Sequence, residues 1–368
     1  MPHTLTAKND DGTPNPVGAV SQRLIAAGSP PLPATARILV YVGLDLIGDG
    51  LIKLPLVRAL RAALPQAQLV WLAGKGRSAY RHELAPLVEP LLDAVIDEAD
   101  IGSRWGELFG RPLGDQRFDL VIDTQRRLLT TLILRRITAD RFVSPAGGFA
   151  FSTVRPPSGY HAPRLLSREL LDLMELGTGY PAQPGPPLAL PQRSLDAARQ
   201  LLPDGLFYVG LVPGAGGTHK CWPLAHYITV GRTLEREGRT PVFILGPKEG
   251  HWRKMIGDAV PSAHFPLQTR VAESLGFPAD LTIAVARRCK AAIANDSGGG
   301  HLMAAADIPL LSLFGPTSPD KFAPSVARGT ILTAQSFGSP SMEVIPVSAV
   351  LTALEALLTP PLKRYQGK

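Results

Sequence analysis

The sequence predicts an α/β protein built from two Rossmann-like domains whose parallel sheets face a central cleft. Three observations support this prediction. The chain has 368 residues, more than one hydrophobic core usually supports. Short apolar runs alternate with amphipathic segments, as in parallel strands joined by helices. A stretch with five prolines, residues 177–191, interrupts this alternation and indicates an interdomain linker.

Composition sets the expected domain boundaries. Residues 1–34 are rich in Pro, Gly, Ala and Asn, so we expect a disordered N-terminal extension there. The remaining boundaries are 35–178 for an N-terminal Rossmann-like domain, 179–192 for the Pro-rich linker, 193–345 for a C-terminal Rossmann-like domain and 346–368 for a closing helix and tail.

In the first half, continuous apolar runs predict buried strands. They are Arg37–Gly43, Gln68–Ala73, Ala94–Asp97 and Phe118–Asp123. The segments between them predict helices at Leu51–Leu64, Ser78–Leu92 and Arg126–Ile137. In the first of these helices, Leu54, Val57 and Leu60 fall on one side at helical spacing, whereas Arg58 and Arg61 fall on the other.

The same alternation restarts after the prolines. The expected strands are Phe207–Val212, Pro241–Leu245, Ala291–Ala294 and Leu310–Phe314. The expected helices cover residues 193–202, 223–237, 279–289 and 347–358. Two successive α/β halves of this kind predict two doubly wound sheets.

The charge balance narrows the class of partner. The net charge of +7 and the pI near 9.5 favour an anionic partner. Aromatic residues make up only 6% of the chain, and no dense Lys/Arg tract is interleaved with aromatics, so nucleic acid is not expected. Cys221 and Cys289 form no C-x-x-C motif, which is consistent with a reducing compartment.

The N-terminal residues also bear on location. They include Asp10 and Asp11 and contain no apolar core segment, so we expect no signal peptide. No uninterrupted apolar run approaches the roughly 18 residues that span a bilayer. A cytoplasmic protein is therefore expected.

A glycine-rich turn follows the strand expected at Ala291–Ala294. Asp296, Ser297 and three glycines lead into a helix expected to start near His301. Glycines let the backbone approach a ligand, and a helix N-terminus offers unpaired N–H groups to an anion. The turn therefore predicts a phosphate site, with an ordinary tight turn as the alternative.

A second glycine-rich turn, residues 213–220, follows the strand at Phe207–Val212. Thr218 offers a hydroxyl, and Lys220 supplies a mobile cation suited to a diphosphate. A generic turn with a solvated lysine is the alternative. Glu249 follows the next strand and can accept hydrogen bonds from ribose hydroxyls, or it is a surface carboxylate at a helix start.

In the first half, Asp49 lies in a Gly-flanked loop at the carboxyl end of the first strand, where doubly wound folds place reactive groups. It is a candidate general base, and capping of the following helix is the alternative role. Asp45 is the competing carboxylate. Arg126 and Arg127 follow a neighbouring strand and can clamp an acidic acceptor, or they belong to a solvated helix face.

Several other classes of site find little support in the sequence. Residues 74–79 match the pattern G-x-G-x-x-A of dinucleotide-binding turns, but they follow the second strand rather than the first. The histidines lack a metal-ligand spacing and no D-x-D pair occurs, so we expect no required metal. No Walker loop and no G-x-S-x-G elbow is present.

Taken together, four segments resemble the ADP-heptose:lipopolysaccharide heptosyltransferases of glycosyltransferase family 9. They read ILVYVGLDLIGDGLIKLPLVRALRAALP, FDLVIDTQ, PGAGGTHKCWP and NDSGGGHLMAAADIPLLSLFGPTSP. Their order and spacing match from about residue 37 to residue 324. The resemblance implies a GT-B fold, with the acceptor on the first domain and the nucleotide sugar on the second. It also implies an inverting, metal-independent transfer in one displacement.

The resemblance also implies roles for individual residues. Asp49 matches the family's catalytic base, and Lys220 with Thr218 matches the contact to the donor phosphates. Glu249 lies near the ribose-binding acid. The phosphate and sugar turn matches Asp296, Ser297, Gly298 and His301. Two positions depart from the usual pattern, since Gly299 and Gly300 stand where larger residues are usual and Arg126 stands where a glycine is usual.

We therefore expect an enzyme that transfers a heptose from ADP-heptose to a lipopolysaccharide core or a similar acidic glycan. The expected acceptor-binding residues are Arg126 and Arg127, no cofactor or metal is expected, and peripheral contact with the cytoplasmic face of the inner membrane is a further expectation. The alternatives are a family member with another nucleotide sugar, a non-catalytic nucleotide-sugar-binding protein, and an NAD-linked oxidoreductase that uses residues 74–79.

Overall fold

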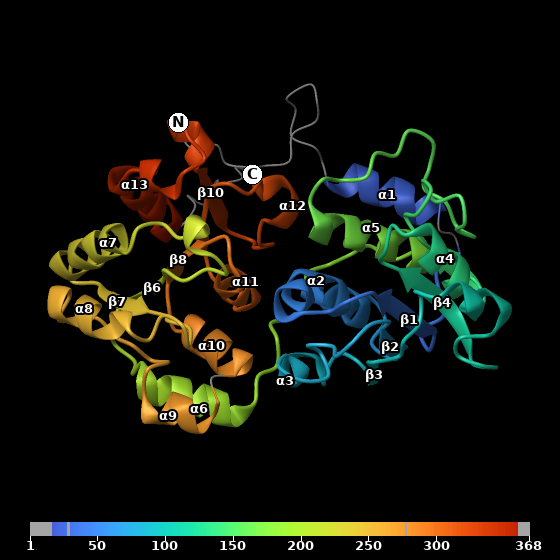
Figure 1. Cartoon of the computed structure of the whole chain (residues 1–368), viewed down its shortest axis with the longest axis horizontal. Helices are drawn as coiled ribbons and strands as arrows, with labels where there is room; N and C mark the ends of the chain where they lie inside the picture. Colours follow the sequence, from blue (N-terminus) through green and yellow to red (C-terminus); the bar gives the residue numbers. More distant parts are fainter. Residues whose placement is uncertain (1–16, 28–29, 277, 360–368) are drawn as a thin grey trace, which may run out of the picture. The chain divides into compact units, whose positions relative to one another are not determined.

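The computed structural model describes residues 17–27, 30–276 and 278–359. They form two compact units that divide between Ala189 and Leu190, inside the proline-rich segment (Figure 1). We call them the N-terminal unit and the C-terminal unit. Each contains one five-stranded sheet in which all neighbouring strands are parallel, so the predicted α/β class with two Rossmann-like domains is confirmed.

The sheet of the N-terminal unit has the strand order β3-β2-β1-β4-β5. Its strands are β1 Arg37–Val42, β2 Gln68–Ala73, β3 Ala94–Ile96, β4 Arg117–Asp123 and β5 Thr138–Val143. The central strand β1 pairs with β2 on one side and β4 on the other, and it is buried along nearly its whole length. The chain therefore turns in opposite directions after β1 and after β4, which makes this pair the topological switch point.

The helices of this unit are α1 Val17–Ala27, α2 Ile47–Ala63, α3 Ala85–Val88, α4 Leu128–Leu134 and α5 Leu166–Thr178, with the 3₁₀ helix η1 Trp105–Phe109. Helix α5 packs against both α1 and α2 (Figure 1). The segment predicted to be a disordered extension thus includes a helix, because α1 buries Leu24. Residues 1–16 and 28–29 of that segment lie outside the described residues.

Two predicted helices of this unit are much shorter than expected. Only Ala85–Val88 is helical within the predicted helix Ser78–Leu92. The Ser78 hydroxyl donates to Asp45 and accepts from the Tyr80 amide, which holds the chain in turns before α3. The predicted helix Arg126–Ile137 is reduced to Leu128–Leu134, so both arginines lie before its first turn.

The sheet of the C-terminal unit has the order β10-β9-β8-β6-β7. Its strands are β6 Tyr208–Val212, β7 Thr240–Phe243, β8 Ala291–Asn295, β9 Leu310–Phe314 and β10 Gly329–Thr333. Its switch point lies between β6 and β8. The edge strands β5 and β10 were not predicted, because both are partly exposed and lack the continuous apolar run of the central strands.

The principal helices of this unit are α6 Gln192–Leu201, α7 Leu224–Arg236, α8 Trp252–Ala259, α9 Arg270–Ser274, α10 Ala279–Ala286, α11 Gly298–Ala305, α12 Pro319–Phe322 and α13 Val347–Leu358. Helices α7 and α13 pack on the sheet and close its core around Trp222, Tyr227 and Leu354. Within the described residues, no helix is both long enough and apolar enough to cross a membrane.

Candidate active site

The switch point of the C-terminal sheet brings three predicted segments to one edge. Strand β8 pairs with β6 on one side and with β9 on the other. The carboxyl ends of these parallel strands therefore lie next to each other, and residues 213–220, 296–297 and 315–317 follow them directly. Ligands of doubly wound folds bind at this position.

Asn295, at the end of β8, fixes the turn after β6. Its side-chain amide donates to the Pro213 carbonyl at 2.7 Å. Its carbonyl oxygen accepts from the Trp222 amide and from the Tyr227 hydroxyl, each at 3.1 Å. Asn295 is 1% exposed, so these bonds satisfy a buried amide and connect two loops far apart in sequence. The sequence analysis did not assign it a role.

Lys220 and Asp296 meet at the centre of this edge. The Lys220 ammonium donates to Asp296 Oδ2 at 2.9 Å, and the Thr317 hydroxyl donates to the same oxygen at 2.6 Å. The Lys220 side chain remains 29% exposed. A lysine ammonium has three donors, so Lys220 can hold Asp296 and still bind an anion. Thr317 belongs to the family-like segment NDSGGGHLMAAADIPLLSLFGPTSP, but it was not predicted as a site residue.

The glycine run at the start of α11 is closely packed. A Cβ atom on Gly299 would lie 2.6 Å from Val212 Cγ1, and one on Gly300 would lie 3.0 Å from the Asn295 carbonyl oxygen. The helix begins at Gly298 rather than near His301, with the Ser297 hydroxyl accepting from the Gly300 amide. The helix N-terminus therefore lies at the strand ends, where its first amides are available to an anion.

His301 lies on α11 and is 9% exposed. Burial lowers its pKa, and the nearby negative charge of Asp296 opposes this shift. Its imidazole is therefore neutral at neutral pH and offers one donor and one acceptor. Thr218 lies in the 3₁₀ helix η2 Thr218–Lys220 and is exposed.

Glu249 lies against two glycine turns of the same edge. A Cβ atom on Gly214 would lie 2.8 Å from Glu249 Cδ, and one on Gly246 would lie 2.6 Å from Glu249 Oε2. The carboxylate is therefore held beside the turns after β6 and β7, and it is only partly exposed. The predicted donor-binding residues thus lie on the turns that follow β6, β7 and β8 or, for Gly298 and His301, at the start of α11.

The switch point of the N-terminal sheet places the two predicted acceptor segments next to each other. The Thr124 amide donates to the Tyr41 carbonyl at 3.2 Å, and the Gln125 amide group packs against Gly43. The loop after β1 therefore runs beside the loop after β4. Asp49 lies in the first turn of α2, directly after the first loop, and Arg126 belongs to the second loop.

Asp49 occupies the first turn of α2, which begins four residues earlier than predicted, at Ile47. The N-cap residue is Leu46 and no side chain caps the helix, so Asp49 does not take the alternative capping role. Among the described residues, none forms a hydrogen bond or an ion pair with its partly exposed carboxylate. The positive end of the helix dipole stabilises its charge.

Asp45, the competing carboxylate, is fully buried. It accepts hydrogen bonds from Trp71 Nε1 at 3.0 Å and from the Ser78 hydroxyl at 2.6 Å, and Lys53 Nζ lies 3.5 Å away. These contacts occupy Asp45 in holding the loop after β1, and they leave Asp49 as the accessible carboxylate of this loop.

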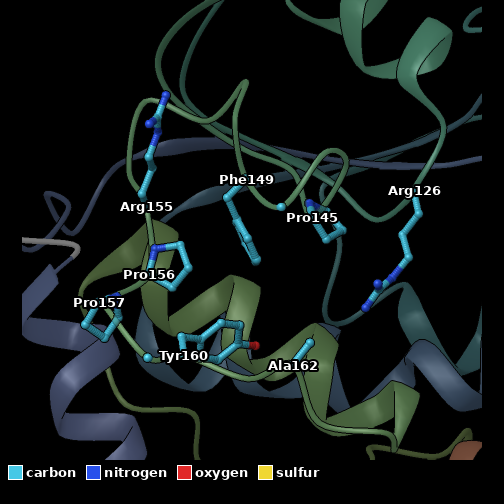
Figure 2. A pocket seen from close by; sticks show the side chains of 10 residues that line it. Arg126, Pro145, Phe149, Arg155, Pro156, Pro157, Tyr160 and Ala162 are labelled. Carbon is cyan, nitrogen blue, oxygen red and sulfur yellow. The ribbon is translucent and has the colours of Figure 1, made fainter.

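Arg126 lines a cavity of about 420 Å³ in the N-terminal unit. Its guanidinium donates to Glu169 Oε1 at 2.6 Å, and Glu169 is buried. Figure 2 shows Arg126 on one side of the cavity and Arg155 on the other, with Phe149 and Tyr160 between them. Arg127 is exposed and is not among the residues that line it.

Sequence reasoning missed Phe149, Arg155 and Tyr160. They lie in a loop, residues 144–165, without the periodicity of a helix or strand. The rings of Phe149 and Tyr160 meet edge to face at 5.9 Å, and the Tyr160 hydroxyl donates to Asp172 at 2.9 Å. An arginine before two prolines was the available signal, because prolines fix the backbone beside it.

The dinucleotide-like pattern at residues 74–79 has a different basis. A Cβ atom on Gly74 would lie 2.1 Å from the Tyr41 hydroxyl, so this glycine is required by packing. Turns rather than a helix follow the pattern. Within the described residues, no group of three or more His, Cys, Asp or Glu side chains is arranged to hold a metal ion.

Comparison with known proteins relates the chain to one family. The sequence profile described as glycosyltransferase family 9 (heptosyltransferase) matches residues 107–344. The chain is 27% identical over 312 residues to lipopolysaccharide heptosyltransferase 2 of Escherichia coli K12, covering 79% of this chain and 86% of that protein. It is 31% identical over 167 residues to lipopolysaccharide heptosyltransferase 2 of Salmonella typhimurium, covering 41% of this chain and about half, 47%, of that protein.

Solved structures share the fold. A glycosyltransferase family 9 protein from Veillonella parvula superposes with a TM-score of 0.64 at 20% identity, covering 89% of this chain and 99% of that chain. For ADP-heptose lipopolysaccharide heptosyltransferase II of E. coli the TM-score is 0.59 at 21% identity, with coverage of 88% and 98%. For E. coli heptosyltransferase WaaC with ADP it is 0.61 at 19% identity, with coverage of 87% and 99%. The predicted GT-B fold is confirmed.

Proposed function

The chain belongs to glycosyltransferase family 9, the heptosyltransferase family, and we propose that it transfers a heptose from ADP-heptose to a lipopolysaccharide-core or similar acidic acceptor. The observation that carries the proposal is the cluster of Lys220, Asp296 and Thr317 at the C-terminal switch point. A fixed ammonium beside a helix N-terminus is suited to the two phosphates of a nucleoside diphosphate sugar. The relatives with heptosyltransferase activity in their names support heptose as the sugar.

In this proposal the C-terminal unit binds the donor. Lys220 and the first amides of α11 stabilise the charge that develops on the departing ADP, and Thr218 adds a hydroxyl donor. Glu249 accepts hydrogen bonds from the ribose hydroxyls. Around the phosphates and the sugar lie Asp296, Ser297, Gly298 and His301. Because Asp296 already orients the lysine, the cation needs little rearrangement when the donor binds.

The N-terminal unit binds the acceptor and supplies the base. Asp49 removes the proton from the acceptor hydroxyl as that oxygen attacks the anomeric carbon, and a single displacement inverts the configuration at this carbon. No partner of the Asp49 carboxylate among the described residues competes with this role, and Asp45, the alternative base, is held by Trp71. Arg126 and Arg127 bind the acidic groups of the acceptor.

Metal independence is part of the proposal. Departure of a nucleoside diphosphate requires positive charge near the β-phosphate, which some transferases take from a divalent cation. Lys220 and the α11 N-terminus provide positive charge at the strand ends without an added ion. We also propose a cytoplasmic location, with peripheral contact to the cytoplasmic face of the inner membrane, because the proposed acceptor is a lipopolysaccharide core.

The first test is thermal unfolding with ADP, UDP, GDP or NAD, for the wild type and for Lys220→Ala. A ligand present at 100 times its dissociation constant stabilises the protein by about 2.7 kcal/mol. Stabilisation by ADP that weakens in Lys220→Ala is expected. Stabilisation by UDP or GDP instead would mean that the donor is a UDP- or GDP-sugar, and the protein would still be a glycosyltransferase. Stabilisation by NAD that does not depend on Lys220 would contradict the proposal.

Turnover separates an enzyme from a non-catalytic binding protein. The glycine run had raised the second alternative, since a loose turn would orient the sugar poorly. The close packing of Gly299 and Gly300 supports a well-defined turn instead. Transfer of heptose from ADP-heptose to a lipopolysaccharide-core acceptor is the expected result. ADP binding without any transfer would favour the binding protein.

A further inference from the structure

Large apolar side chains are exposed together on one surface of the N-terminal unit. Among the described residues, Phe109 and Trp105 of η1 are the most exposed large apolar side chains, at 88% and 70%. Leu128 and Leu132, one turn apart on α4, are also exposed. We call these four side chains and the arginines beside them the η1–α4 surface. The arginines are Arg104, Arg111, Arg127, Arg135 and Arg136, all of them exposed.

Hydrogen bonds join η1 and α4 into one surface. The Thr130 hydroxyl of α4 donates to the Gly102 carbonyl before η1 at 2.7 Å. Arg136 Nε, after α4, donates to the Gly110 carbonyl after η1 at 3.4 Å. The other side of each helix packs inward, with Leu108 and Leu129 against the core cluster of the N-terminal unit. The exposed apolar residues are therefore on the opposite side from the core.

The surface carries excess positive charge. Arg104 is paired with Asp100 at 2.6 Å and Arg111 with Asp115 at 2.8 Å. Within the described part of the chain, the remaining three arginines have no carboxylate partner. Glu107, the acidic residue of η1 itself, turns away and accepts hydrogen bonds from backbone amides before η1. The surface thus combines exposed aromatic and aliphatic groups with uncompensated cations.

We propose that the η1–α4 surface binds an anionic lipid bilayer. Tryptophan and phenylalanine insert at the boundary between headgroups and acyl chains, and arginines bind the lipid phosphates. Apolar side chains that are exposed together, rather than scattered singly, commonly mark a protein or membrane interaction site. The charge favours an anionic bilayer over a neutral one, because each arginine near an anionic surface adds electrostatic attraction.

The purpose of this surface rests on the proposed function, because an enzyme with a lipid-linked acceptor must reach that acceptor at a membrane. Helix α4 follows directly on Arg126 and Arg127, the proposed acceptor residues, and Arg127 is its N-cap. A bilayer on this surface therefore lies beside the acceptor segment of the same unit. The geometry does not depend on the identity of the sugar.

The test is cosedimentation of the whole protein with vesicles of phosphatidylcholine, with and without phosphatidylglycerol. The test variant is Trp105→Ser/Phe109→Ser, and the matched control is Met255→Ser/Phe337→Ser, two exposed apolar residues of the C-terminal unit. We expect the wild type and the control to bind the anionic vesicles. The test variant should bind them at least about tenfold more weakly. Added salt should weaken the binding of the wild type.

Quenching by brominated lipids adds a local readout. Of the four tryptophans, Trp71 and Trp222 are buried and Trp252 of α8 in the C-terminal unit is partly buried, whereas Trp105 is exposed. We expect quenching in the wild type and its loss in Trp105→Phe. Equal vesicle binding by the wild type and the Trp105→Ser/Phe109→Ser variant would overturn the proposal. So would a concentration-dependent dimer of the wild type that disappears in this variant, since a second copy would then cover the surface.

Failure of this inference is separable from failure of the proposed function. Transfer to a water-soluble oligosaccharide acceptor without acyl chains should be equal in the wild type and in Trp105→Ser/Phe109→Ser. If no heptose is transferred but the vesicle results hold, the donor or acceptor is wrong and the lipid surface stands. If transfer holds but vesicle binding is absent, the lipid surface is wrong and the transferase stands.

Discussion

The two sheets have the same doubly wound plan, yet their switch points differ in how much is already assembled. In the C-terminal unit, Lys220, Asp296 and Thr317 are joined by hydrogen bonds from three different loops. In the N-terminal unit, Asp49 contacts no charged partner among the described residues, and the Arg126 guanidinium is occupied by Glu169. The C-terminal edge is organised around a fixed cation, whereas the N-terminal edge presents a carboxylate without a partner among the described residues.

The strands at the two switch points end in different buried groups, each with three hydrogen-bond partners. Strand β8 ends in Asn295, a buried neutral amide with three partners. Strand β4 ends in Asp123, a buried carboxyl that accepts from the Thr131 and Ser144 hydroxyls and the Gln125 amide. The C-terminal strand end is therefore neutral, whereas the N-terminal strand end carries an ionisable group.

The largest effect is expected at Asp49. Asp49→Asn removes the base but keeps the shape of the side chain, so the rate of heptose transfer should fall by about 10²–10⁴-fold. ADP affinity should be unchanged, because the donor belongs to the other switch point. Steady-state transfer assays and ADP titration measure both. Unaltered turnover would remove Asp49 from the mechanism.

Asp45→Asn is the control within the same loop. It leaves Lys53 without its buried partner and disturbs the bonds to Trp71 and Ser78. We expect a loss of about 3 kcal/mol in the free energy of unfolding, seen as a lower midpoint in urea. Transfer by the protein that remains folded should be far less affected than in Asp49→Asn.

Asp123 at the end of β4 predicts that the stability of the N-terminal unit depends on pH. Burial raises the pKa of Asp123 to about 6. A carboxyl with a raised pKa contributes stability that is complete below its unfolded pKa, about 4, and is lost as the pH rises through about 6. The two-unit shift corresponds to roughly 3 kcal/mol. The wild type should lose this much between pH 4 and pH 8 relative to Asp123→Asn, measured by urea unfolding; parallel pH profiles would contradict the assignment.

Lys220→Met tests the proposed donor site in the C-terminal unit through its affinity for ADP. A hydrogen bond to a charged group contributes about 1.5–3 kcal/mol, so ADP should bind about 10- to 100-fold more weakly. Lys254→Met is the matched control, because this exposed lysine pairs only with Asp258 on α8. Isothermal titration with ADP distinguishes them. Equal affinities in the two variants would place the diphosphate elsewhere.

The smallest effect tests the glycine run. Gly299→Ala brings a Cβ atom to 2.6 Å from Val212, and overpacking of this kind costs about 1–3 kcal/mol. A Cβ atom on Gly298 meets nothing within 4 Å, so Gly298→Ala should change the free energy of unfolding by less than about 1 kcal/mol. Thermal unfolding compares the two. Similar melting temperatures would mean that α11 shifts freely on β6.

The same contrast explains how much the sequence could predict. The turns proposed to bind the donor are encoded locally, since glycines, a hydroxyl and a lysine lie within a few residues of a strand end. Their location was therefore predicted, although Asn295 and Thr317 were missed because their partners lie 82 and 21 residues away. The cavity lined by Arg126 depends on the pairing of Arg126 with Glu169, 43 residues away, and on an aperiodic loop. No short motif encodes it.

Helix boundaries were wrong where glycines were interpreted as loop residues. Helix α2 begins at Ile47, before Gly48 and Gly50, because Gly50 packs tightly against Leu84 and Tyr80. Helix α11 begins within its glycine run for a similar reason, the contact of Gly299 with Val212. In both cases tertiary packing overrode the low helix propensity of glycine, which a single sequence does not reveal.

The most direct measurement is an isothermal titration of ADP into the wild type, Asp49→Asn and Lys220→Met, with heptose transfer assayed on the same preparations. The account predicts that Asp49→Asn binds ADP as the wild type does but transfers at least about 100-fold more slowly, whereas Lys220→Met binds ADP about 10-fold or more weakly. Weakened ADP binding in Asp49→Asn together with normal binding in Lys220→Met would contradict the division of donor binding and base catalysis between the two units.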